Sequence, residues 1–330
     1  MAGHDAQPGR LPEIALLEEF RASLVDNGPA LGEMQVRLLL DTLGLGNKQA
    51  FEFLSSQRPD RATFLDWVFS IAGTPDPVLL ARYHAIARGD PLPAQAESFL
   101  HEIEAMPDVL DTSQLSHWDS EGYVVLPEAI SAQEAGQASA ALWEAINASP
   151  DDPASWYRAH TQGIMVPLYQ HRALDAARQS RRIHKAFAQL WGDADLWVTT
   201  DQAGFNPPED EGYAFNGSPM HWDVSLVTPI PFATQAVLYL TDTAHDQGAF
   251  QCVPGFHKRI ETWLDDPANT DPRAADWSDQ ARTVPGQAGD MVIWRQDLPH
   301  GASPNRSAQP RLVQYLNYYS PSLHVQKDWR

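Results

Sequence analysis

Short strand-like segments separated by turns run from about residue 195 to residue 318, and they constrain the fold more than any other feature. Residues 235–241 are rich in strand-forming side chains, Gly289 and Asp290 make a turn into an apolar strand, and a further strand begins at Arg311. Repeated short strands predict a mainly β core of the sandwich or barrel type. Helices are expected beside it, over 131–148 and 171–191.

The first hundred residues have a different pattern, because their apolar residues recur at helical spacing between Gly- and Pro-containing breaks. This pattern predicts a purely helical subdomain over residues 11–108, after a disordered tail over residues 1–10 and before a β-containing domain over residues 109–330. We expect the aromatic residues of the subdomain to form its core, and its surface is a possible homodimer contact. The predicted helices cover 11–26, 32–43, 47–56, 61–72, 77–88 and 93–105.

The composition of the chain limits the kinds of molecule it is expected to bind and the compartment in which it is expected to fold. The chain has 330 residues, 43% of them hydrophobic, and a formal net charge of −20, which argues against nucleic acid and anionic membranes as partners. We find neither an apolar signal core nor a run of eighteen apolar residues, and the single cysteine, Cys252, suits a reducing compartment. We therefore expect a cytoplasmic protein in which Cys252 is a packed core thiol. The one basic cluster, Arg178 to Lys185, is expected to be a solvated helix face.

The motif His221-Trp222-Asp223 is a candidate metal site. In an extended strand, residues two apart point to the same side, so the imidazole of His221 and the carboxylate of Asp223 can bind one ion, with His300 as the third ligand. Two histidines and one carboxylate on one face of an octahedral ion form the facial triad of non-haem Fe(II) oxygenases. Zinc is the competing metal.

A second copy of the motif, His117-Trp118-Asp119, needs a different interpretation. Its flanking residues are typical of a helix, where positions two apart diverge, so we expect no metal site there. The copy at His221 instead follows a turn signal over residues 216–219, where a sheet is expected to begin.

Arg311 adds a further constraint, because it begins a strand eleven positions after His300 (311 minus 300). An uncompensated guanidinium inside a β fold is costly, so a carboxylate partner is expected. A dicarboxylic acid would suit its planar donor fork.

Four stretches of the sequence resemble the phytanoyl-CoA dioxygenase family of Fe(II)/2-oxoglutarate oxygenases. Residues 116–127 are similar to its opening strand, with Trp118 at the aromatic position, and 246–258 resemble its stretch ending V-P-G-S-H-K. Residues 289–290 and 300–305 resemble its G-D and H-G-S-x-x-N motifs, with Ala302 where serine is commoner. The resemblance covers about residues 110–320 and implies a double-stranded β-helix, the cupin-like jelly roll.

The resemblance also implies roles for individual residues. His221, Asp223 and His300 would be iron ligands, and Arg311 would anchor the distal carboxylate of 2-oxoglutarate. Ser303 is expected to assist that anchor. The other end of the cosubstrate would be held by Gln202 or Asn206, between which the sequence does not choose.

The function implied is oxidation, most readily hydroxylation, of a C–H bond of a small metabolite or natural-product intermediate. Fe(II), 2-oxoglutarate and O2 would be required, and succinate and CO2 released. Two alternatives stay open, a catalytically silent jelly-roll binding or scaffold protein and a metal enzyme that uses no keto acid. The candidate substrate contacts, each of which could equally be ordinary packing, are Tyr213, Phe215, Trp222, Met165 and Trp156.

Overall fold

The computed structural model describes residues 13–215, 218 and 220–330. The predicted disordered tail over residues 1–10 and most of the turn signal at 216–219 lie outside these residues. None of the helices in the described part of the chain is both long and apolar enough to cross a membrane.

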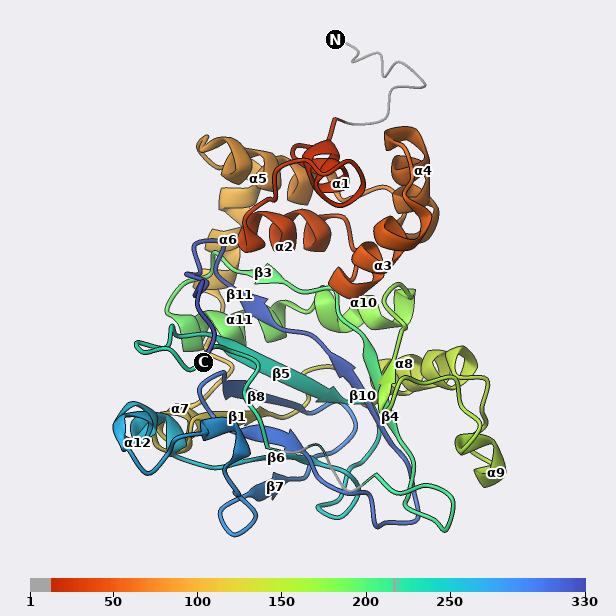
Figure 1. Cartoon of the computed structure of the whole chain (residues 1–330), viewed down its shortest axis with the longest axis vertical. Coiled ribbons are helices and arrows are strands. Elements are labelled where there is room, and N and C mark those ends of the chain that lie inside the picture. Colours follow the sequence, from red (N-terminus) through yellow and green to blue (C-terminus); the bar gives the residue numbers. More distant parts are fainter. Residues whose placement is uncertain (1–12, 216–217, 219) are drawn as a thin grey trace.

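Six helices form the upper part of the molecule in Figure 1. Three of the five breaks between them contain capping residues: Asp60 accepts a hydrogen bond from the N–H of Thr63, Asp76 caps the next helix, whose first residue is Pro77, and Gly89 ends that helix in the left-handed conformation. The predicted helices over 61–72 and 77–88 are therefore confirmed at both ends. The six are α1 (Leu17–Val25), α2 (Glu33–Thr42), α3 (Asn47–Gln57), α4 (Arg61–Ala72), α5 (Pro77–Arg88) and α6 (Ala94–Ala105).

Six more α-helices of the described residues precede or interrupt the strands. The expected single helix over 171–191 is wrong in one respect: it is broken at residues 179–180, where Ser180 caps the second half by accepting a hydrogen bond from the N–H of Ile183. Two short 3-10 helices cover 256–258 and 272–274. The α-helices are α7 (Thr112–Glu121), α8 (Ala132–Ala145), α9 (Pro153–Trp156), α10 (Arg172–Arg178), α11 (Arg181–Trp191) and, between strands, α12 (Ile260–Asp265).

The strands form one large sheet and two small ones, in which every pairing is antiparallel. The large sheet has the order β1-β8-β5-β10-β4-β2, and the small ones are β7-β6-β9 and β11-β3. Their bounds are β1 (Tyr123–Leu126), β2 (Met165–Val166), β3 (Trp197–Val198), β4 (Ala203–Asn206), β5 (Thr234–Tyr239), β6 (Phe250–Cys252), β7 (Arg282–Val284), β8 (Met291–Arg295), β9 (His300–Ala302), β10 (Arg311–Tyr315) and β11 (Tyr318–Tyr319).

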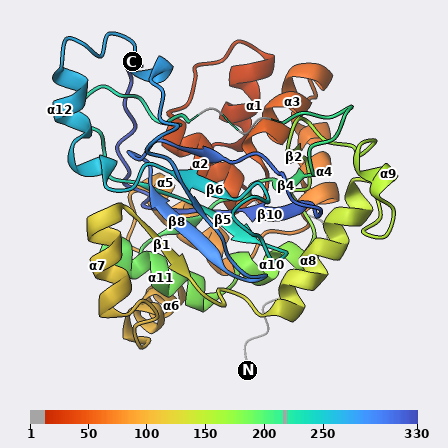
Figure 2. The same cartoon turned by 90° about the horizontal axis from the view of Figure 1, so that it is seen from below.

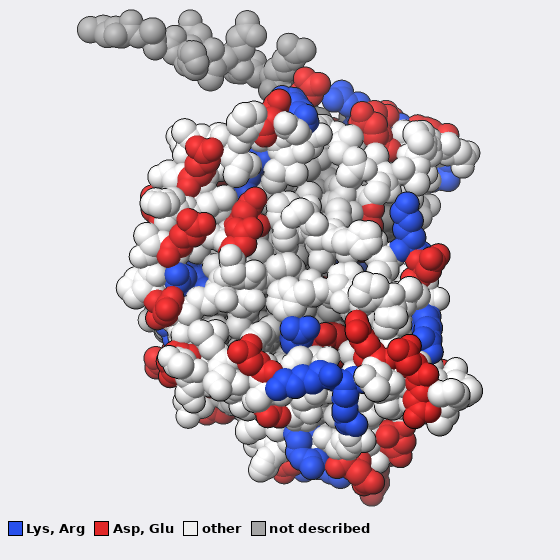
Figure 3. Space-filling view, turned by 90° about the vertical axis from the view of Figure 1, so that its left-hand side faces the viewer, with Lys and Arg blue, Asp and Glu red and all other residues white. Residues whose placement is uncertain are grey.

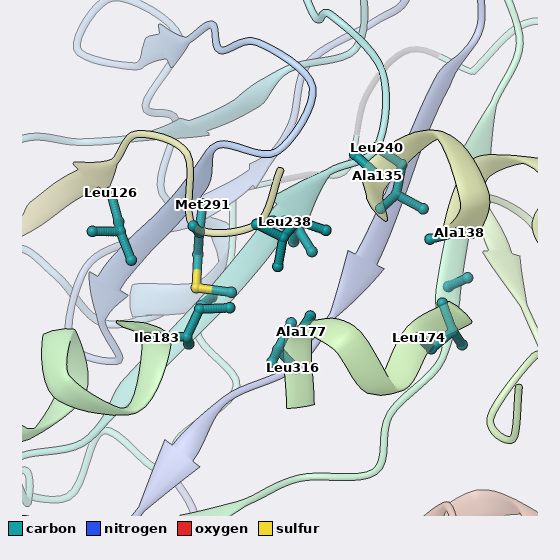
Figure 4. Close-up of a cluster of buried hydrophobic side chains, with 14 of the residues drawn as sticks. Leu126, Ala135, Ala138, Leu174, Ala177, Ile183, Leu238, Leu240, Met291 and Leu316 are labelled. Carbon is teal, nitrogen blue, oxygen red and sulfur yellow. The ribbon is translucent and has the colours of Figure 1, made fainter. Parts of the chain in front are cut away.

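Alternation along the strands gives the large sheet two apolar faces. Ala236 and Leu238 of β5 belong to a cluster shared with α8, α10 and α11, which Figure 4 shows in close-up. Val237 and Tyr239 face the opposite way, into a second cluster that includes Phe250 of β6. Figure 2 accordingly shows α8, α10 and α11 along one side of the sheet and α12 on the other. The large sheet thus packs against helices on one face and against the sheet β7-β6-β9 on the other.

Charged side chains also depart from one expectation. The basic cluster on α10 and α11 is not a uniformly solvated face, because Lys185 is buried and donates to the carbonyl of Glu104 at 2.9 Å, while Arg178 donates to that of Asp201 at 3.1 Å. On the face shown in Figure 3, acidic and basic groups are interspersed around a largely uncharged centre. Cys252 is buried in the second apolar cluster, which confirms the prediction of a packed thiol.

Candidate metal and cosubstrate site

Three candidate metal ligands lie where the sheet β7-β6-β9 faces the large sheet. His300 is the first residue of β9, and His221 forms a single antiparallel bridge with it, in which the two backbone N–H···O distances are 2.9 and 3.0 Å. His221 and Asp223 therefore do not lie in a regular strand, as the sequence predicted, but in the connection between β4 and β5. The bridge to β9 nevertheless fixes the segment beside His300.

The side chains of the three residues converge. One ligand atom from each can be chosen so that all lie within 4.8 Å of one another. Nε2 of His300 is 3.2 Å from Oδ2 of Asp223, and Nε2 of His221 is 3.5 Å from Oδ1. A donor set of two imidazoles and one carboxylate fits a divalent transition metal.

Surrounding groups orient these ligands. Nδ1 of His300 lies 3.1 Å from the carbonyl oxygen of Leu298, an arrangement in which Nδ1–H donates and Nε2, once a metal displaces its proton, presents its lone pair. Gln235 of β5 donates from Nε2 to Oδ2 of Asp223 at 2.7 Å. Burial alone would raise the pKa of Asp223, but the hydrogen bond and charge of His300, together with Gln235 and His221, hold it well below its usual range. The carboxylate is therefore ionised, as a metal ligand must be.

Arg311 lies at the start of β10 with only 2% of its surface exposed. Its Nη1 donates to the carbonyl of Gly248 at 2.7 Å, whereas Nε and Nη2 have no hydrogen-bond partner among the described residues. A buried guanidinium with two unused donors is costly unless a ligand completes it.

The other predicted cosubstrate residues differ in position. Gln202 lines the same cavity as the triad and Arg311, and its Oε1 is buried without a partner among the described residues. Asn206, paired in register with Arg311, and Ser303 are both buried and have polar side-chain atoms without a partner in the described part of the chain, but neither lines the cavity.

A cavity of about 700 Å³ connects the metal ligands and Arg311. The side chains of His221 and Asp223 are 42% and 54% exposed toward it, while His300 is buried. Met165 of β2 lines the cavity as well. The ligand atoms are thus open on one side, where a cosubstrate and a substrate can reach them.

The remaining predicted substrate contacts lie elsewhere. Trp222 is 2% exposed, donates to the carbonyl of Asp297 and packs in the second apolar cluster, and Trp156 is buried in the cluster beneath α8. Tyr213 and Phe215 are half-buried and not among the cavity-lining residues. The second motif copy, His117 to Asp119, lies on α7 as predicted.

The cavity also has a wall that sequence reasoning missed. Five residues of the N-terminal helices α2 and α3 line it: Arg37, Leu40, Asp41, Asn47 and Lys48. No local pattern marks them, since they reach the site only through the tertiary packing of α2 and α3. Gln235 was also missed, although a lone polar side chain in an apolar strand is a detectable signal.

Comparison with known proteins agrees with this geometry. The model of the phytanoyl-CoA dioxygenase (PhyH) family matches residues 118–313, more than half of the chain. A methylphosphonate hydroxylase from Gimesia maris is 27% identical over 222 residues, which are 64% of this chain and 82% of that protein. A putative phytanoyl-CoA dioxygenase from Dictyostelium discoideum is 20% identical, over 61% of this chain and 73% of that protein.

Solved structures with a similar chain path include two crystallised with 2-oxoglutarate. EvdO2 from Micromonospora carbonacea var. aurantiaca has a TM-score of 0.47 at 18% identity, covering 68% of this chain and 96% of its own. HygX from Streptomyces hygroscopicus, with nickel and 2-oxoglutarate bound, has a TM-score of 0.47 at 16% identity, covering 65% and 88%.

Proposed function

We propose that this chain, which belongs to the phytanoyl-CoA dioxygenase family of non-haem iron, 2-oxoglutarate-dependent dioxygenases, hydroxylates a C–H bond of a small molecule. Fe(II), 2-oxoglutarate and O2 are the cofactor and cosubstrates of this class. The facing antiparallel sheets fit the double-stranded β-helix expected of the family, and the proposal assigns it to residues 109–330.

The proposal assigns the metal to His221, Asp223 and His300. Their convergence within 4.8 Å and the ionised state of Asp223 support this assignment. Three protein ligands leave further positions of an octahedral ion for the cosubstrates, and imidazole with carboxylate suits Fe(II).

The observation that carries the proposal is Arg311, because it lines the same cavity as the three ligands and its buried Nε and Nη2 have no partner among the described residues. A carboxylate of 2-oxoglutarate would accept from these donors and neutralise the charge. Gln202 is our choice for the opposite end of the cosubstrate, because it lines the cavity and Asn206 does not.

Bound Fe(II) with 2-oxoglutarate and O2 supplies the oxidising power for attack on a C–H bond. The chain contributes placement: Gln235 and the carbonyl of Leu298 fix the ligand orientations, and the enclosed cavity holds the substrate beside the open face of the site. Hydroxylation is the activity named for the Gimesia relative, which is our reason for proposing it among the oxidations open to this class.

The test is an anaerobic titration of the protein with Fe(II) and 2-oxoglutarate, following the visible charge-transfer absorption of the chelated complex and, after adding O2, succinate release. We expect both signals in the wild type and neither in Asp223→Ala. Asp119→Ala, in the second copy of the motif on α7, is the matched control and should behave as wild type. Metal binding without the absorption would point to an enzyme that uses no keto acid, and no metal binding would support the silent scaffold.

A further inference from the structure

Helices α2 and α3 lie outside the segment that matches the family, which covers residues 118–313, yet they line the cavity that holds the candidate metal ligands. In Figure 1 both helices lie directly above the strands. The wall formed by residues 37–48 is therefore a part of the cavity that the family match does not cover.

Buried polar contacts hold this wall against the β domain. Asp41 of α2 accepts from the N–H of Thr200 at 2.7 Å and from the hydroxyl of Tyr319 at 2.8 Å. The side-chain amides of Gln49 and Gln170 hydrogen-bond with each other, at 3.0 and 2.8 Å. Such a wall is positioned well enough to recognise a substrate, because its orientation does not depend on one contact.

Arg37 is a cation of this wall with unused hydrogen-bonding capacity. Its guanidinium lies 5.3 Å from the centroid of the Tyr319 ring, and its nearest carboxylate is the exposed Glu33 one turn away, at 3.7 Å. Within the described part of the chain it donates no hydrogen bond. Lys48, the other cation of the wall, is already bonded to Gln162. Arg37 thus offers a planar set of donors to whatever occupies the cavity.

Besides the candidate metal ligand Asp223, two carboxylates in the cavity wall, Asp41 and Asp201, would favour a cationic ligand instead, but both are already engaged. The two oxygens of Asp41 accept from Thr200 and Tyr319, and Oδ1 of Asp201 accepts from the N–H of Gln202. Burial raises the pKa of Asp41 to about 7, so this group holds less negative charge near neutral pH than a solvated carboxylate, and burial also raises the pKa of Asp201. The unused donors of Arg37, together with the engaged carboxylates of Asp41 and Asp201, favour an anionic ligand in this part of the cavity.

We infer that the wall formed by α2 and α3 selects the substrate, and that Arg37 binds an oxyanion of it, a phosphonate or a carboxylate. The inference rests on the proposed function, because it places the substrate between Arg37 and the metal ligands. Arg37 and the three candidate metal ligands line the same cavity, so one bound molecule can contact both.

The experiment measures binding of four probes of similar size to the protein loaded with Fe(II) and 2-oxoglutarate under argon. The probes are methylphosphonate, propionate, neutral propionamide and cationic propylammonium, and the readout is broadening of their proton NMR signals by the paramagnetic iron. Zinc-loaded protein corrects for broadening that is not caused by iron. We expect saturable broadening for at least one oxyanion and none for the cation.

Arg37→Gln should weaken oxyanion binding about tenfold, which is the effect of losing one charge-assisted hydrogen bond. Arg61→Gln, at the exposed start of α4 and outside the cavity, is the matched control and should bind as wild type. Comparing the two oxyanions then tells which one Arg37 prefers.

Several results would overturn the inference: no oxyanion binding, equal binding of the cation or the amide, or unchanged oxyanion binding in Arg37→Gln. Loss of the 2-oxoglutarate absorption in Arg37→Gln would do so too, by placing Arg37 on the cosubstrate. Absence of that absorption in the wild type would instead contradict the proposed function, so the two failures are distinguishable.

Discussion

Replacing Arg311 by methionine should separate two effects of its buried charge, the destabilisation of the fold and the binding of 2-oxoglutarate. Arg311 is 2% exposed, and among the described residues its guanidinium makes one hydrogen bond, to the neutral carbonyl of Gly248. Methionine keeps much of the length and apolar volume of the side chain and removes the charge. We therefore expect opposite effects on stability and on cosubstrate binding.

Two energies decide the stability change. Removing the donor leaves the carbonyl of Gly248 without its partner, which costs about 1–3 kcal/mol. Removing a buried charge without a counter-charge relieves a penalty of several kcal/mol. The free energy of unfolding of the protein without ligands should therefore rise by about 1–2 kcal/mol. Binding of 2-oxoglutarate, which loses two charge-assisted hydrogen bonds, should weaken by roughly 100-fold or more.

Urea unfolding without ligands and 2-oxoglutarate titration with Fe(II) measure the two effects. Arg306→Met serves as the control, because its side chain is 71% exposed and only 3.6 Å from Glu209, and it should change neither quantity appreciably. A loss of more than about 2 kcal/mol in Arg311→Met, with cosubstrate affinity retained, would make Arg311 a structural residue and refute the reasoning.

Three further substitutions test the packing around the site. Asp41→Asn should leave the free energy of unfolding unchanged near pH 4 and raise it by about 2–4 kcal/mol at pH 8. The reason is that folding raises the pKa of the wild-type carboxyl to about 7, so its contribution to stability is full below pH 4 and is lost as the pH rises through 7. Urea unfolding at both pH values measures this difference. Trp222→Ala should lower the free energy of unfolding of the metal-free protein by about 3–5 kcal/mol. A loss below 1 kcal/mol would show that Trp222 is not a core residue and would support its predicted role as a substrate contact. Gly46→Ala would place Cβ 2.1 Å from the ring of Tyr169 and cost about 1–3 kcal/mol, a loss that should vanish in a Tyr169→Ala background.

The helices that were predicted most accurately are those whose ends have capping residues recognisable in the local sequence. Asp60 and Asp76 cap α4 and α5 by accepting hydrogen bonds from residues two or three positions ahead, so a short window contains the whole signal. The candidate ligands were found for a similar reason, because His221 and Asp223 stand two apart and His300 and Arg311 lie in recognisable stretches near strands. The dimer contact predicted for the helical region stays a prediction.

The candidate substrate contacts were harder to predict because adjacency in sequence does not set direction in space. Trp222 stands between two ligands, and its side chain points the other way, into the cluster with Phe256 and Trp277. Successive residues of an extended segment alternate in direction, so a residue between two ligands is expected on the opposite side. The same alternation that supported His221 and Asp223 argued against Trp222.

The cavity wall depends on contacts that no sequence window contains. Asp41 meets Thr200 across 159 residues and Tyr319 across 278, and Trp197 and Tyr319 complete the apolar core beneath the N-terminal helices. The helical region and the β domain therefore share one buried boundary, so α2 cannot shift without disturbing β3 and β11. Asp41 and its two partners hold α2 in place and therefore set the position of residue 37 relative to the metal ligands. A substitution at position 37 that is meant to change substrate preference should therefore leave these three residues unchanged.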